Sequence, residues 1–351
     1  MSKFPGPIWE ELYRKYGTSY FGCPPERKMD TLSNDLTRYL IESTPSNQLP
    51  KISVACKGSQ VWSTVVNEHL KSRFRMKVSL SIKPQDETSS TAGIFLCAMK
   101  KDHNNQESDW DLRGTHFARL SQFNIHCLTQ GVNRYDEFRG CRARQIGLGS
   151  VTDMLQKIPI DKYMDDDCTE FNISGNHMEA SHAAIIEKLL IGGLQRNFTI
   201  VQLSQIRNQP VLLEQIVAFF VDSPTLKTLW IRYCDVKECL LEPLANMLFK
   251  KRTVDCKIYV DFYFPLNTVA ALIEKWKKTD GLYTNTSSIQ IGFSDEDWMQ
   301  LRNEIHMETT RGIQIIHINH TQGNAKLKLL FTQYSEVTIE VVVNGRKRRC
   351  D

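Results

Sequence analysis

The sequence predicts an α/β protein in which an N-terminal helical region is followed by an array of strand–helix units and a β-rich C-terminal end. Apolar residues recur at helical spacing between about residues 32 and 70. Short strand-like segments then recur at a nearly constant interval from residue 168 onward, with helical patterns between them. Two further β-rich segments close the chain.

The composition is that of a globular protein. The chain has 351 residues, 41% of them hydrophobic and 24% charged, which excludes a disordered or low-complexity chain. The net charge of +4 is too small for a dedicated nucleic-acid binder. No apolar stretch approaches the roughly 18 residues of a membrane span, and the N-terminus lacks the apolar core of a secretory signal. We therefore expect a cytoplasmic and/or nuclear protein.

The ten cysteines contain no C-x-x-C pair, so a structural zinc site is not expected. Because the cysteines are scattered along the chain, we expect them to be small apolar core residues of a protein in a reducing compartment.

Changes in composition divide the chain into five expected parts. They are a leader (1–28), a helical region (29–75), a mixed region (76–167) with a polar insertion (83–115), the α/β array (168–345) and a basic tail (346–351). In the helical region, Leu36 and Leu40 mark one helical face before a break at Pro45 and Pro50, and a second helical stretch is interrupted near Gly58.

The period of the array is typical of a degenerate leucine-rich-repeat-like solenoid. The first residues of successive apolar pairs lie 28 to 31 positions apart: Phe171/Ile173, Val201/Leu203, Leu229/Ile231, Ile258/Val260 and Ile289/Ile291. TLKTLWIRYCDV comes closest to the repeat consensus. The alternative is an ordinary α/β domain whose units happen to be equal in length.

The β-rich end is expected to form a cap. The segments 313–318 and 327–343, the second with a turn around Gln333, could pair as a hairpin. Before them, Ser294 and Asp297 have the spacing of a capping box that opens a final helix.

Alternation along the strands predicts an exposed row of side chains. If Leu229/Ile231 and Ile258/Val260 face the helices, the opposite face carries Trp230, Arg232, Tyr259 and Asp261. Parallel pairing would place Trp230 beside Tyr259, and Arg232 beside Asp261. These residue types dominate interface hot spots, so we predict a partner-binding surface here. Alternatively, another layer, such as residues 116–165, covers this face and makes the aromatic residues part of the core.

No motif for catalysis, a metal or a cofactor is recognisable. Gly147 and Gly149 lack the remainder of a nucleotide-binding loop, so a turn before a helix capped by Ser150 or Thr152 is expected. The pairs His177/His182 and His317/His320 lack a third ligand, and Asp165–Asp167 lacks the spacing of a calcium loop. We expect a protein that is not an enzyme.

The segment LSNDLTRYLIESTPSNQLPKISVACKGSQVWSTVVNEHL resembles an F-box. The resemblance implies that these helices bind the Skp adaptor of a cullin–RING ubiquitin ligase, with apolar anchors laid on a partner helix. The implied adaptor-binding residues are Leu32, Leu36, Leu40, Leu49, Ile52, Val54 and Trp62.

The whole layout resembles the nematode F-box proteins with an FTH-like C-terminal region. This implies a non-catalytic substrate receptor whose repeat face binds an unknown protein substrate. Ser33 stands where the family has proline, and Trp62 lies further from Cys56 and Lys57 than is usual. These departures favour an alternative, a repeat-type interaction scaffold without ligase function. A third possibility is a nucleic-acid-associated protein using the basic tail and stacking by Trp230 and Tyr259.

Overall fold

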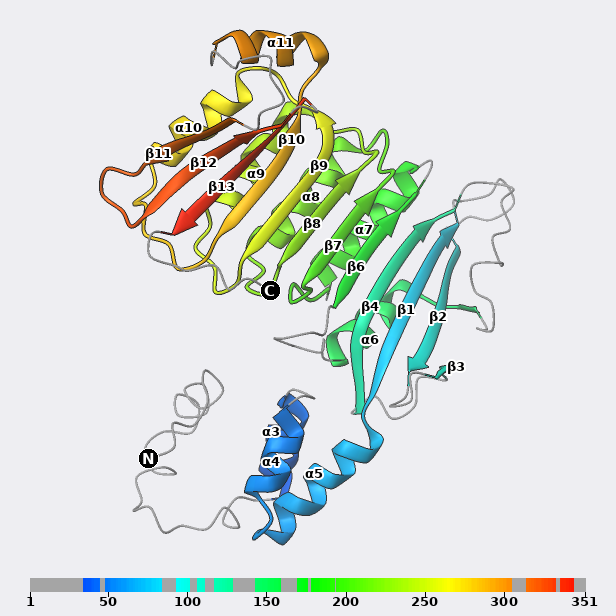
Figure 1. Ribbon diagram of the computed structural model, residues 1–351. Helices are drawn as coiled ribbons and strands as arrows, with labels where there is room; N and C mark the ends of the chain where they lie inside the picture. The colour runs from blue at the N-terminus through cyan, green and yellow to red at the C-terminus, as the bar shows by residue number, and fades with distance from the viewer. Residues whose placement is uncertain are drawn as a thin grey trace. The chain divides into compact units, whose positions relative to one another are not determined.

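The chain divides into two compact units, Met1–Arg73 and Phe74–Asp351 (Figure 1). The computed structural model describes residues 34–44, 48–83, 93–101, 106–110, 117–128, 143–158, 169–175, 178–192, 194–304, 314–332 and 335–343. The predicted leader, basic tail, acidic triplet Asp165–Asp167, Leu32 and His177 lie outside these residues.

The first unit contains three described helices: α3 (Asn34–Ser43), α4 (Leu49–Ala55) and α5 (Gln60–Ser72). Pro50 lies in the first turn of α4, where a missing N–H costs little, so it begins this helix instead of breaking one. The chain turns after Cys56, and Ser59 then caps α5 by accepting a hydrogen bond from the Trp62 N–H (3.3 Å).

The second unit is built on a 13-stranded mixed sheet. Its strands are β1 (Phe74–Lys83), β2 (Gly93–Lys101), β3 (Glu107–Asp109), β4 (Ala118–Cys127), β5 (Arg144–Gln145), β6 (Glu170–Ser174), β7 (Ile200–Ser204), β8 (Thr228–Arg232), β9 (Cys256–Tyr263), β10 (Ser287–Gly292), β11 (Gln314–Asn319), β12 (Ala325–Phe331) and β13 (Glu336–Val343). The spatial order is β11-β12-β13-β10-β9-β8-β7-β6-β4-β1-β2-β3, and β5 also pairs with β2. The predicted α/β class is confirmed, because helices and a large mixed sheet make up this unit.

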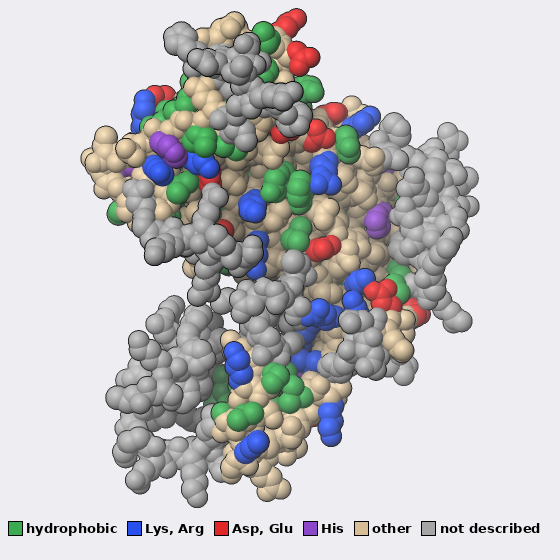
Figure 2. Space-filling model, viewed as in Figure 1, with side chains coloured by type: hydrophobic (Ala, Val, Ile, Leu, Met, Phe, Trp, Pro, Cys, Tyr) green, Lys and Arg blue, Asp and Glu red, His purple; other side chains and the backbone are tan. Residues whose placement is uncertain are grey.

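Parallel strands form the centre of the sheet, and neighbours in space follow one another along the chain from β6 to β10. The connecting helices are α6 (Leu148–Lys157), α7 (Ala180–Gly192), α8 (Pro210–Val221), η5 (Glu238–Leu240), α9 (Leu241–Leu248) and α10 (Thr268–Lys277), and α11 (Asp295–Glu304) follows β10. Crossovers of one hand that always advance in one direction leave their helices on one face. Figure 1 shows α7, α8 and α9 together behind the strands. The opposite face of the sheet is the side seen in Figure 2.

The core lies between the sheet and these helices. Alternate strand residues such as Leu229 and Ile231 are fully buried there. Phenylalanines from successive units pack on one another, with ring centroids 5.2 Å apart for Phe171 and Phe220 and 5.5 Å apart for Phe171 and Phe198. A single apolar layer therefore joins the units.

Hydrogen bonds also join each unit to the next at the amino ends of the strands. The Thr199 N–H donates to the Thr169 carbonyl (3.0 Å), and the Lys227 N–H donates to the Thr199 carbonyl (2.8 Å). The Lys257 N–H continues the series to the Lys227 carbonyl (2.7 Å). Each unit thus supplies a carbonyl acceptor for a backbone N–H of the unit that follows it.

Both predicted β-rich segments are present: 313–318 corresponds to β11, and 327–343 contains β12 and β13. β11 pairs antiparallel with β12, as the expected hairpin requires, and β12 in turn pairs antiparallel with β13. The sequence did not predict that β13 would also pair antiparallel with β10. The end of the chain therefore extends the main sheet. Ser294 accepts a hydrogen bond from the Asp297 N–H (3.2 Å) at the start of α11, as the capping spacing predicts.

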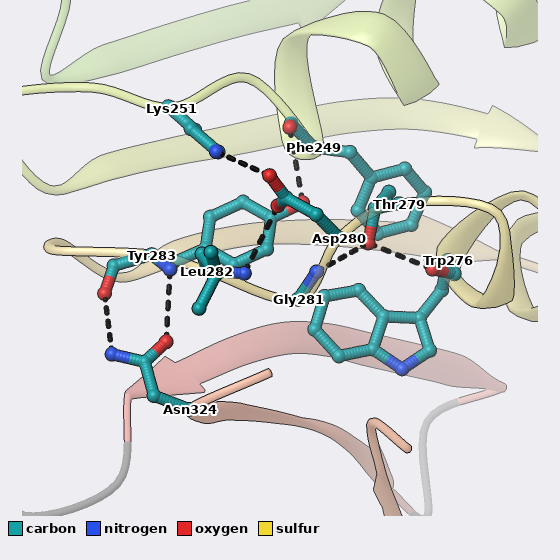
Figure 3. A network of polar contacts seen from close by, with 9 residues as sticks. All are labelled: Phe249, Lys251, Trp276, Thr279, Asp280, Gly281, Leu282, Tyr283 and Asn324. Atoms are coloured by element: carbon teal, nitrogen blue, oxygen red, sulfur yellow. Dashed lines mark hydrogen bonds and ion pairs between the residues drawn. The ribbon is translucent and has the colours of Figure 1, made fainter. Parts of the chain in front are cut away.

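A polar network ties this end to the array (Figure 3). The Asn324 side chain exchanges two hydrogen bonds of 3.0 Å with the backbone of Tyr283, and the Tyr283 hydroxyl donates to the Phe249 carbonyl (3.1 Å). Gly281, with φ +63°, lies so close to Gly323 that a Cβ on Gly323 would stand 2.1 Å from the Gly281 carbonyl oxygen. Glycine is therefore required at this contact.

The mixed region is not a separate body, because β1, β2 and β4 belong to the same sheet as the array. Within the region expected to be a polar insertion (83–115), the apolar residues 94–99 form part of β2. The expected cap of α6 by Ser150 or Thr152 is wrong. The N-cap residue is Gly147, and the Thr152 hydroxyl instead donates back to the Gly149 carbonyl (2.8 Å).

The described cysteines are mostly buried, as expected of apolar core residues: Cys56, Cys127, Cys234 and Cys256 are free and buried, and Cys239 is free and exposed. Burial raises the pKa of the Cys127 thiol to about 12. Cys97, however, is disulfide-bonded, so the expectation of reduced cysteines is wrong there. No helix in the described ranges is both long and apolar enough to cross a membrane.

Candidate protein-interaction surfaces

The predicted open-face residues lie on β8 and β9. Trp230 and Tyr259 face each other in register across the two parallel strands. Both are half-buried, whereas Arg232 and Asp261 are exposed. The residues between them, including Ile231, are buried against the helices, so the predicted alternation holds.

Trp230, Tyr259 and Arg232 form a three-layer stack. The Trp230 and Tyr259 rings are nearly parallel at 11°, with centroids 3.9 Å apart. The Arg232 guanidinium carbon lies 4.1 Å from the Trp230 ring centroid. Because Tyr259 occupies one face of the indole, the guanidinium must occupy the other. The stack is therefore formed before any partner binds.

The predicted placement of Arg232 beside Asp261 stays a prediction. No ion pair joins them among the described residues, and the register of β8 with β9 is recorded only as far as Ile231 and Val260. Arg232 lies on the Trp230 ring instead. Asp261 is left as an exposed carboxylate beyond the end of the regular pairing.

A row of amide side chains continues across the sheet from this stack. Asn124, Asn172 and Gln202 occupy successive strands in register with Trp230. The Asn172 amide donates to Asn124 Oδ1 (2.8 Å), and Asn124 donates to Ser79 Oγ (3.1 Å). Within the described part of the chain, Asn172 Oδ1 has no hydrogen-bond partner. A polar, partly organised surface therefore adjoins the aromatic stack.

Two exposed tyrosines near the stack were missed by sequence reasoning. Tyr263 ends β9 in register with Gly292, and Tyr233 follows β8; their exposed fractions are 67% and 62%. Alternation continued from Tyr259 and Asp261 would have found Tyr263. Tyr233 has φ +55° at a bend that follows β8, which alternation does not predict. Figure 2 shows hydrophobic side chains gathered over β8 and β9, with Lys and Arg close by.

The alternative of a covering layer is not supported by the described part of residues 116–165. β4 is a strand of the sheet itself. Helix α6 lies on the helix side, where the Gln195 amide donates to the carbonyls of Leu155 and Ile158 (2.9 Å each). The stack is consequently half-exposed rather than part of the core.

The predicted adaptor-binding residues that the structure describes form a buried group and a partly exposed group. Leu40, Leu49 and Trp62 lie in the core of the helical unit, together with Ile41 and Val66. Helix α5 packs against both α3 and α4 around these side chains. They hold the helices together, so they present no surface to a partner in this conformation.

The remaining adaptor-binding residues reach the surface of the helical unit to different extents. Leu36 and Ile52 are half-buried against the core, and Val54 is 65% exposed. Tyr39 of α3 is also exposed. A partner helix could contact these positions without unfolding the unit.

A buried arginine that the sequence did not single out fixes the end of α3. The Arg73 guanidinium donates to the carbonyls of Thr44 (2.6 Å) and Ile41, and its Nε donates to His69 Nδ1 (3.2 Å). Ile41 lies in the last turn of α3 and Thr44 directly follows the helix, a position where backbone acceptors often lack intrahelical partners. No local pattern marks Arg73, because the two carbonyls that it binds lie 29 and 32 residues earlier in the chain.

The described residues offer no group of three or more metal-ligating side chains. His182 is fully buried; its Nδ1 accepts from the Glu179 N–H (3.0 Å), so Nε2 donates to the Ile82 carbonyl (3.2 Å). Desolvation lowers its pKa, and the nearby Glu179 charge opposes the shift. Its role is to join α7 to β1.

Comparison with profiles of known families, with curated proteins and with solved structures finds no match to this chain. The helical unit and the strand face of the sheet are therefore the basis of the proposed function.

Proposed function

We propose that this protein is a non-catalytic substrate receptor of a cullin–RING ubiquitin ligase. In this proposal the helical unit is an F-box that binds the Skp adaptor, and the strand face of the sheet binds a protein substrate. The observation that carries the proposal is the preformed stack of Arg232, Trp230 and Tyr259 on a face that the connecting helices leave uncovered.

Preorganisation supports the binding role of this face. A partner that packs on the edges of the stack need not order these three side chains first, which lowers the entropic cost of binding. Tryptophan, tyrosine and arginine are also the residues that most often dominate interface energies. The amide row beside the stack offers directional hydrogen bonds to a peptide backbone.

The solenoid interpretation belongs to the same proposal. Sequential parallel strands, helices on one face and unit-to-unit hydrogen bonds are what a degenerate leucine-rich-repeat-like array requires. Such arrays characteristically bind partners on the strand face. The β11–β13 strands then act as its C-terminal cap.

The adaptor role rests on the F-box resemblance and on the exposed apolar residues of the helical unit. Val54, with Leu36 and Ile52 less exposed, offers the anchors that a partner helix would cover. Linking two binding surfaces in one chain would raise the effective concentration of substrate at the ligase. The proposed location is the cytoplasm and/or the nucleus, although the Cys97 disulfide argues against a reducing compartment.

The second candidate function is an interaction scaffold that does not bind the adaptor. Burial of Leu40, Leu49 and Trp62 in the core of the helical unit favours it, because these residues then have a purely structural role. The nucleic-acid alternative is disfavoured, since both faces of the Trp230 indole are already covered by Tyr259 and Arg232.

The test is co-purification of the full chain with the Skp adaptor, comparing Val54→Asp with Val211→Asp. Val54 on α4 and Val211 on α8 are 65% and 63% exposed, so both substitutions add the same charge at matched surface positions. We expect wild type and Val211→Asp to bind, and Val54→Asp to lose binding with an unchanged thermal transition. Absence of wild-type binding supports the scaffold function instead.

A further inference from the structure

The last strand in the spatial order, β11, has a described partner strand on one side only. It pairs with β12 and ends the sheet. The His320 N–H donates to the Ala325 carbonyl. Because hydrogen-bonded residues alternate along an antiparallel strand, this bond shows which residues of β11 are hydrogen-bonded to β12. The backbone groups of even-numbered residues therefore point to β12, and those of Ile315, His317 and Asn319 point outward.

The two edges of the sheet differ in how they are protected. At the β2 edge, the three-residue β3 and two-residue β5 cover separate parts of β2, and Arg144 of β5 lies 3.7 Å from Asp109 of β3. Short, charged edge strands of this kind discourage further pairing. β11 has six residues, QIIHIN, with no charged residue and no proline. Ile315 on it is 48% exposed.

The sequence of β11 is self-complementary about His317. In an antiparallel pair of two copies centred on this residue, Ile316 lies opposite Ile318 of the other copy, and Ile315 lies opposite Asn319. Ile316 and Ile318 already pack half-buried against the core. Pairing would continue this apolar row from one copy into the next, while the outward N–H and C=O groups of the odd-numbered residues would form about six hydrogen bonds.

We propose that β11 is a homodimerisation edge, at which two copies of this chain pair antiparallel about His317 and join their sheets into one. The contact is independent of the proposed ligase function, because β12, β13 and β10 separate β11 from the Trp230–Tyr259 stack. A single strand pair buries less than the roughly 1,200 Å² typical of stable interfaces, so the dimer is weak and concentration-dependent.

Sedimentation equilibrium of the full chain, up to on the order of 100 µM, tests the proposal. We expect a monomer–dimer equilibrium for wild type and for His317→Ala, which keeps the backbone N–H. His317→Pro removes that donor at an edge position that tolerates proline, so it is expected to be monomeric with an unchanged thermal transition. A wild-type monomer at the highest concentration, or dimerisation unaffected by His317→Pro, would overturn the proposal.

Disulfide trapping tests the register and does not depend on the proline variant folding. Across a hydrogen-bonded antiparallel pair the Cα atoms are about 5.5 Å apart, within the range of a disulfide. Under mild oxidation, His317→Cys should form a covalent dimer whose 317–317 linkage is identified by peptide mapping. Asn319→Cys is the control, because its expected neighbour is Ile315 of the other copy. Equal trapping of both variants would contradict the register centred on His317.

Discussion

The helical unit and the strand face carry tryptophans with opposite roles. Trp62 was predicted to contact a partner and is 3% exposed in the core of the helices, whereas Trp230 is half-buried on the sheet surface, stacked on Tyr259. Strand alternation assigns each side chain to one of two faces, so knowing one face identifies the other. Helical periodicity marks an apolar side but does not say whether that side meets its own chain or a partner.

The largest expected effect separates these two tryptophans. Trp62→Ala should reduce the free energy of unfolding of the helical unit by about 3–5 kcal/mol, because it leaves a cavity among packed side chains. Trp230→Ala should cost about 1 kcal/mol in the sheet, where its stacking on Tyr259 and Arg232 and part of its buried surface are lost. Hydrogen exchange of each unit under increasing denaturant measures both. Similar losses of unfolding free energy in the two variants would contradict the assignment of Trp62 to the core and Trp230 to the surface.

The next effect concerns the buried arginine of the helical unit. Arg73→Ala should cost about 2–3 kcal/mol, because the Ile41 and Thr44 carbonyls lose a charged donor. The matched control is Arg38→Ala, which removes an exposed arginine 3.5 Å from Glu68 and should cost less than about 0.5 kcal/mol. Denaturant melts followed by circular dichroism compare them. Equal effects would show that Arg73 does not hold α3 in place.

A smaller effect is expected from pH in the sheet unit. The pKa of His182 is lowered in the folded protein, so below the ordinary histidine pKa of about 6.5 the unfolded chain binds a proton that the folded chain does not. The stabilisation is complete above that pH and declines as the pH falls through it, by at most about 1.4 kcal/mol per pH unit.

His182→Gln provides the comparison, because its amide keeps one donor and one acceptor but does not titrate. The variant should lose part of the pH dependence of the melting temperature between pH 7 and 5. A slope identical to that of wild type would show that His182 does not contribute.

The sequence predicted most of the array because its signals are local. The apolar pairs, the capping residues before α11 and the pairing of Trp230 with Tyr259 all follow from short-range alternation and an interval of about 30 residues. The stacking of Arg232 on Trp230 could not be predicted, because it depends on a side-chain conformation beyond the end of the regular β8–β9 register. Arg73 and the contact of Gly281 with Gly323 depend on residues that are distant in the chain.

The most direct test of the proposed receptor is hydrogen exchange of the full chain with and without the Skp adaptor, read by mass spectrometry. The proposal predicts that the adaptor slows exchange in peptides covering α3, α4 and α5 and leaves β8 and β9 unchanged, because the substrate surface stays free. No protection anywhere, or protection at Trp230 and Tyr259 instead of the helices, would contradict the assignment of the two surfaces.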